Sequence, residues 1–161
     1  MAFDLSMPSL VSLVVMAGIL VLCSYYDLRD GRVSNQVLLL LGIVGLAMVS
    51  ITGQLFAEWI LHATATVTFL VLGYALFRQG AIGGADLKTS LIIGIVSPGV
   101  QLGTWTDPVF EAFIASTVQL AVMLFLGYLY WKIPGRPESQ PVPLIPSLLF
   151  AYLLVQVLAL V

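Results

Sequence analysis

Long apolar stretches broken by short polar segments dominate the chain. Six can be counted: Pro8–Tyr26, Ser34–Ile51, Ala57–Phe77, Leu87–Leu102, Pro108–Trp131 and Val142–Val161. Most of them reach or approach the roughly 20 residues that a helix needs to cross the hydrocarbon of a bilayer. The pattern predicts an all-α fold, a polytopic membrane bundle of six transmembrane helices, built as a single membrane-embedded domain over residues 1–161.

The fourth stretch departs from the others. It is short, and it carries Gly94, Pro98 and Gly99. Proline and glycine interrupt helices, so we expect helix 4 to be kinked or to stop before the far side of the membrane.

Composition supports a membrane protein and excludes several classes of site. The chain is 60% hydrophobic and 9% charged, which is too apolar for a soluble domain of this size. The net charge is −2 and the basic residues are dispersed, so the sequence shows no basic cluster of the kind that binds nucleic acid. Cys23 and His62 are the single members of their types, so an internal disulfide and a Cys- or His-based metal site are excluded. We expect no cofactor and no metal.

The basic residues predict the orientation in the membrane. All six fall in odd-numbered loops, whereas the even-numbered loops carry Glu58, Asp107 and Glu111. Positive charge accumulates on the cytoplasmic side, so odd loops should be cytoplasmic and both termini outside. The basic residues are Arg29, Arg32, Arg78, Lys88, Lys132 and Arg136.

Two aspartates then converge on one face. Asp27 ends the first apolar stretch and Asp86 opens the fourth, so both should lie at the cytoplasmic surface. A carboxylate at a membrane boundary is costly unless it is solvated, paired or used. Their approach is possible in a bundle only a few helix diameters of about 10 Å across.

Each aspartate also has an ordinary structural interpretation. Asp27 could be a solvated loop carboxylate paired with Arg29 or Arg32, and Asp30 is interpreted as a solvated turn residue. Asp86 could be an N-cap or first-turn acid of its helix, where the helix dipole favours it.

Taken together, the two acids suggest an acid–base dyad. Close carboxylates cannot both ionise readily, so one keeps a proton and polarises a carbonyl while the other activates water. Cys23 and His62 are expected on opposite membrane sides, which excludes a Cys–His pair. Two alternatives stay open: a small proton- or cation-coupled carrier that uses the same carboxylates, and a structural subunit that tolerates their loss.

The segments around both aspartates resemble a known family. Asp27-Leu-Arg-Asp-Gly-Arg-Val-Ser34-Asn35 is similar to the first aspartate motif of the prepilin peptidases, and Gly83-Gly-Ala-Asp86-Leu-Lys88 resembles their second, the G-x-G-D motif followed by a hydrophobic residue and lysine. Six helices, with these motifs at helices 1 and 4, match the short form of that family. Pro143-Leu-Ile-Pro146, which opens the last helix, also resembles a family feature.

The resemblance implies an activity and a set of site residues. Asp27 and Asp86 would be catalytic, and Gly83, Gly84 and Lys88 would contact substrate. The substrate would be a prepilin-like or preflagellin-like precursor, cut at the cytoplasmic face of the cell membrane behind a short basic leader. The larger relatives carry an N-terminal segment with paired cysteines linked to methyl transfer; without one, we expect peptidase activity and no methyltransferase activity.

Two positions depart from the family pattern. Ala85 stands where the second motif usually has its second glycine, and Ser34 replaces the usual proline of the first. Alanine is a mild change, so activity is expected to survive it.

Overall fold

The computed structural model describes residues 2–3, 6–100, 103–104, 106–132 and 142–158. Helices make up almost all of this part of the chain. They are α1 (Met7–Asp30), α2 (Asn35–Ile51), α3 (Gln54–Ala57), α4 (Trp59–Arg78), α5 (Gly84–Val96), α6 (Pro108–Trp131) and α7 (Ile145–Leu158). The one sheet in the described part pairs β1 (Ala2–Phe3) with β2 (Gly103–Thr104), antiparallel. The predicted all-α class is therefore confirmed, although α3 and the short strand pair were not expected.

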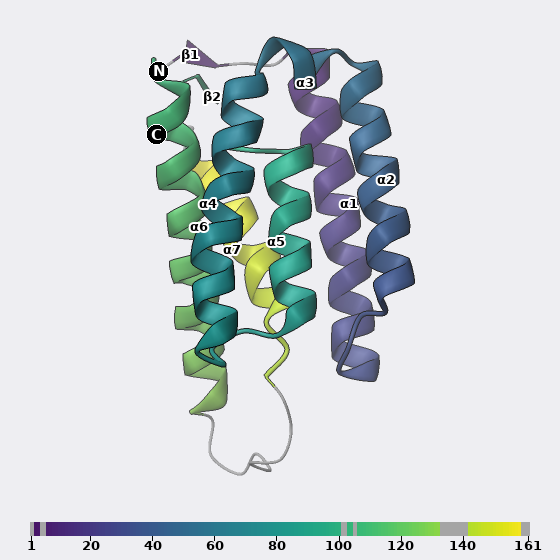
Figure 1. Ribbon diagram of the computed structural model, residues 1–161, viewed down its shortest axis with the longest axis vertical. Coiled ribbons are helices and arrows are strands. Elements are labelled where there is room, and N and C mark those ends of the chain that lie inside the picture. Colours follow the sequence, from purple (N-terminus) through teal and green to yellow (C-terminus); the bar gives the residue numbers. More distant parts are fainter. Residues whose placement is uncertain (1, 4–5, 101–102, 105, 133–141, 159–161) are drawn as a thin grey trace.

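The long helices stand side by side along the long axis of the molecule (Figure 1). α5 packs against α4 and α2, while α7 packs against α6 and α1. At one end of the bundle, the last turns of α1, α4 and α6 lie near the first turns of α2, α5 and α7 (Figure 1). Both sequence motifs fall at this end.

The outer surface of the bundle is apolar, as a bilayer requires. Large hydrophobic side chains remain exposed on α1, α2, α4 and α6, including Val14, Leu39, Val67 and Phe125. In the part of the chain that the structure describes, three helices, α1, α4 and α6, are long and apolar enough to cross a membrane. α2 and α7 are apolar but shorter, with 17 and 14 residues. The protein is an integral membrane protein with an all-helical architecture.

The fourth predicted stretch corresponds to α5, and its boundaries differ from the prediction. The helix begins at Gly84 rather than Leu87 and ends at Val96, before Ser97 and Pro98. Leu102 lies outside the described residues. Its 13 residues span about 20 Å, less than the roughly 30 Å of bilayer hydrocarbon. The expectation of a short helix is confirmed.

Small residues bring α5 close to its neighbours. A Cβ added at Gly94 would lie 2.8 Å from the Cα of Thr66, so α4 and α5 touch there through their backbones. Without a hydrophobic force between helices in lipid, such close packing supplies much of the association energy. This contact fixes α5, the carrier of Asp86, against α4.

Candidate active site

Asp27 lies in the last turn of α1 and is directed into the protein. The helix continues to Asp30, where Gly31 ends it in the left-handed conformation with φ of 65°. The Asp27 side chain is only 8% exposed. Its Oδ2 accepts a hydrogen bond of 3.2 Å from the main-chain N–H of Ile145, the first residue of α7. The amides of a first turn have no partner within their own helix, so α7 offers Asp27 a donor and the positive end of its dipole.

The interpretation of Asp27 as a solvated loop carboxylate is wrong. The residue is helical and buried, because α1 runs four residues beyond the predicted end at Tyr26. In the described part of the chain, Arg29 pairs instead with Asp30, at 3.7 Å, and both side chains are at least half exposed. Asp30 is therefore the solvated member of the segment, as expected, although it ends the helix and does not lie in a turn.

Asp86 is the third residue of α5, and the residue as a whole is 7% exposed. The main-chain N–H of Gly83 donates a 2.8 Å hydrogen bond to Asp86 Oδ2. This is the backbone contact of a first-turn cap, so the structural interpretation of Asp86 is confirmed. The cap uses one carboxyl oxygen. Among the described residues, no hydrogen bond to the second carboxyl oxygen of Asp86 is found.

A single cavity of about 480 Å³ brings the two aspartates together. α1 contributes Asp27 to its lining, and the first turn of α5 contributes Asp86. The walls mix polar backbone with apolar side chains. Besides the two acids, the lining consists of Gly31, Arg32, Gly80, Ala81, Ile82, Gly83, Gly84, Ala85, Val142 and Leu144.

The two glycines predicted to contact substrate, Gly83 and Gly84, both line this cavity, but they differ in how much room they leave for a side chain. Gly83 has an ordinary extended backbone, with φ of −83°, so its conformation does not demand glycine. A Cβ there would lie 3.0 Å from Asp86 Oδ2, which is tighter than usual contact. At Gly84 an added Cβ would meet Phe77 at an ordinary 3.8 Å. Gly83 is therefore the position where a side chain would disturb the acid.

Lys88 lies two residues after Asp86 on α5 and is not among the residues that line the cavity. Its Nζ donates a 2.6 Å hydrogen bond to Oδ1 of Asn35, the first residue of α2. Ser34 caps α2: its hydroxyl accepts from the N–H of Val37 at 3.3 Å. A capping serine supports the start of this helix through a hydrogen bond, where a proline would do so through its fixed φ. The Ser34 departure is thus compatible with the same local structure.

Three neighbours of the aspartates at the start of α7 were not named as site residues from the sequence. Ile145 holds Asp27, and Val142 and Leu144 form part of the cavity wall. The available signal was the pair Pro143 and Pro146, because proline marks a helix start and a helix start exposes free amides. Nothing in the local pattern indicates which side chain those amides would face.

Among the described residues, neither Cys23 nor His62 lines the cavity. Cys23 is fully buried, and His62 is buried with its Nδ1 2.8 Å from the carbonyl oxygen of Ile95. No group of three His, Cys, Asp or Glu residues there is placed to hold a metal ion.

Comparison with known proteins adds one finding. The sequence model of the type IV leader peptidase family matches residues 14–160. This range includes both aspartates, the cavity that they share and the start of α7. No curated protein sequence and no solved structure shows significant similarity to the chain.

Proposed function

Because the chain belongs to the type IV leader peptidase family, we propose that it is an aspartic endopeptidase of the cell membrane. It removes the short basic leader from prepilin-like or preflagellin-like precursors. The whole chain forms one membrane-embedded peptidase domain. Methyl transfer is not part of the proposal, and its absence stays a prediction.

The observation that supports this function best is the shared cavity. Two buried carboxylates, from helices far apart in the sequence, face the same space of about 480 Å³. With one carboxyl protonated and the other ionised, the ionised group takes a proton from water as the water attacks the scissile carbonyl. The protonated group stabilises the developing oxyanion and then supplies the proton to the leaving amine. The peptide bond breaks into a carboxylate on the leader and a free amine on the mature subunit.

Hydrogen bonding gives the two acids different surroundings. Asp27 accepts from the first amide of α7, and Asp86 accepts from its own N-cap amide. Each is thereby held at one oxygen, which leaves the other for water or substrate. Positioned groups lower the barrier because the geometry is arranged before the reaction begins.

We propose six membrane-crossing helices, α1, α2, α4, α5, α6 and α7, with the cavity at the cytoplasmic side and both termini outside. The basic residues support this orientation. Basic residues lie within or next to the helix ends at the cavity end of the bundle (Figure 1): Arg29, Arg32, Arg78, Lys88 and Lys132. Arg136 lies outside the described residues. The shortness of α5 would then place its far end below the outer surface.

Gly83 and Gly84 are proposed to admit the extended backbone of the substrate beside Asp86. Lys88 would contact the same segment at the rim, since its ammonium group has three donors and the contact with Asn35 uses one. Of these two glycines, Gly83 is the more important in this proposal, because it leaves less room for a side chain than Gly84 does.

The test compares Asp27→Asn and Asp86→Asn with Asp30→Asn as matched control. Each purified variant is mixed in liposomes with a precursor made of a basic leader, a glycine before the scissile bond and an apolar helix. We expect no cleavage with the first two variants and normal cleavage with the third, whose side chain is exposed and paired with Arg29. Processing by either of the first two would refute the dyad. A carrier that uses the same carboxylates finds no support in the family match.

A further inference from the structure

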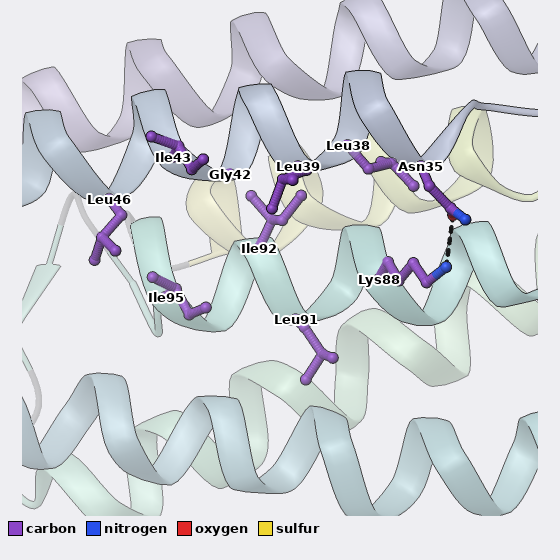
Figure 2. Close-up of a pocket in the computed structure, with 10 residues that line it drawn as sticks. All are labelled: Asn35, Leu38, Leu39, Gly42, Ile43, Leu46, Lys88, Leu91, Ile92 and Ile95. Atoms are coloured by element: carbon purple, nitrogen blue, oxygen red, sulfur yellow. Dashed lines mark hydrogen bonds between the residues drawn. The ribbon is translucent and has the colours of Figure 1, made fainter.

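A second hollow, of about 460 Å³, lies between α2 and α5, outside the acid cavity. Figure 2 shows that α2 supplies one wall and α5 the other. The walls are apolar along their whole length, with Leu39, Leu46 and Ile95 among them. Asn35 and Lys88 supply the only charged or amide side chains in the lining. We call this hollow the α2–α5 groove.

The α2–α5 groove begins where the acid cavity ends. α5 lines the cavity with Gly84 and Ala85 and, about one turn later on the same side of the helix, lines the polar end of the groove with Lys88. The next turns of the same helix line the groove with Leu91, Ile92 and Ile95. The other wall has the same order: Arg32 lines the cavity, and Asn35 opens the groove three residues later. The two hollows therefore follow one another along the bundle axis.

We propose that the α2–α5 groove binds the apolar helix of the substrate, the segment that follows the scissile bond. This inference rests on the proposed peptidase function and adds where the substrate is held. A peptide bond in the acid cavity leaves the chain only a short extended link before its helix begins. That helix must start near Lys88 and run into the membrane, which is the course of the groove.

The size and chemistry of the groove fit this occupant. From Asn35 to Leu46 it follows 11 residue steps of α2, or about 16 Å, which corresponds to three turns of a bound helix. Apolar walls match an apolar helix. The hydrogen bond between Lys88 Nζ and Asn35 Oδ1, at 2.6 Å, places polar groups only where the extended link of the substrate would pass (Figure 2). Helix binding in a groove by apolar contacts at successive turns is a common mode of recognition.

Filling the groove provides the first test. A Cβ at Gly42 would meet Ile92 at 3.5 Å, an ordinary contact, so Gly42→Leu extends a side chain into the groove without a backbone clash. Gly18→Leu is the matched control, because that helical glycine of α1 has open space around it. We expect the KM for the precursor to rise about tenfold in Gly42→Leu, because the added side chain takes the place of about one leucine-sized contact between the groove and the substrate helix. The kcat should stay within about twofold of the wild type, because the acid cavity is unchanged. Gly18→Leu should match the wild type.

Cross-linking provides the second test. A photoreactive benzophenone amino acid replaces Leu39, which lines the groove, or Leu40, its neighbour on α2, which does not. The two side chains are equally accessible, at 66% and 62% exposed. In an Asp86→Asn background, which keeps the precursor intact, we expect at least fivefold more cross-linked precursor from position 39 than from position 40 (order of magnitude from one well-packed contact).

The outcomes separate the two proposals. If the wild type cleaves the precursor but positions 39 and 40 cross-link equally and Gly42→Leu has a normal KM, the groove holds lipid chains only and this inference is wrong. If the wild type does not cleave the precursor, the peptidase proposal fails and the inference falls with it. A preference for position 39 together with a raised KM in Gly42→Leu supports it.

Discussion

The main-chain N–H of Ile145 donates a 3.2 Å hydrogen bond to Asp27 Oδ2, although the two residues lie 118 positions apart. The contact joins the last turn of α1 to the first residue of α7. Both partners are buried. It fixes one of the two acids and makes the start of α7 part of the site.

Removing that N–H should impair the reaction. Ile145→Pro deletes the donor at a helix position that tolerates proline, whereas Ile145→Ala keeps the donor and removes the same packing. A hydrogen bond to a charged group contributes about 1.5–3 kcal/mol. We therefore expect kcat of Ile145→Pro to be at least about tenfold below that of Ile145→Ala, with similar KM, in precursor cleavage assays. Equal kcat values would show that Asp27 does not depend on this amide.

The cap at α5 separates the structural role of Asp86 from its proposed catalytic role. Asn at position 86 can still accept from the Gly83 amide, whereas Ala cannot. Both variants should be inactive. Only Asp86→Ala should lose stability, by about 1 kcal/mol, in denaturant unfolding monitored in detergent. Residual cleavage by Asp86→Asn would show that the residue only caps the helix.

Gly83 should tolerate no side chain. The Cβ of Gly83→Ala would lie 3.0 Å from Asp86 Oδ2 and displace that carboxyl group. We expect cleavage to fall about tenfold or more, because a small misplacement of a catalytic group is costly. Gly18→Ala, in open space on α1, is the control and should behave as the wild type. Normal activity in Gly83→Ala would mean that Asp86 can move without loss of function.

Gly94 tests the packing that supports the site. In Gly94→Ala the new methyl group would lie 2.8 Å from the Cα and 2.9 Å from the N of Thr66, and backbone atoms cannot rotate away. We expect a loss of about 1–3 kcal/mol of stability from this overpacking. Thermal unfolding in detergent measures it, again against Gly18→Ala. Unchanged stability would show that α4 and α5 can separate freely at this contact.

The sequence alone determined the class of protein, because apolar length and charge are local properties. The apolar stretches predicted helices that the structure contains, including a short one at α5. The motifs around Asp27 and Asp86 indicated the family that the comparison then showed. The exact helix ends were missed: α1 extends to Asp30 because Gly31 accommodates the left-handed turn that closes it.

Only the tertiary structure decided how the aspartates are placed. Whether Asp27 is solvated or buried depends on what packs against it, and that is α7, from the far end of the chain. Asp86 is a helix cap in any local interpretation, and the cavity that it shares with Asp27 is what supports the catalytic role that we propose for it. Such long-range packing leaves no local pattern, so the sequence could predict only that both acids lie at one membrane face, whereas the fold showed that they line one cavity.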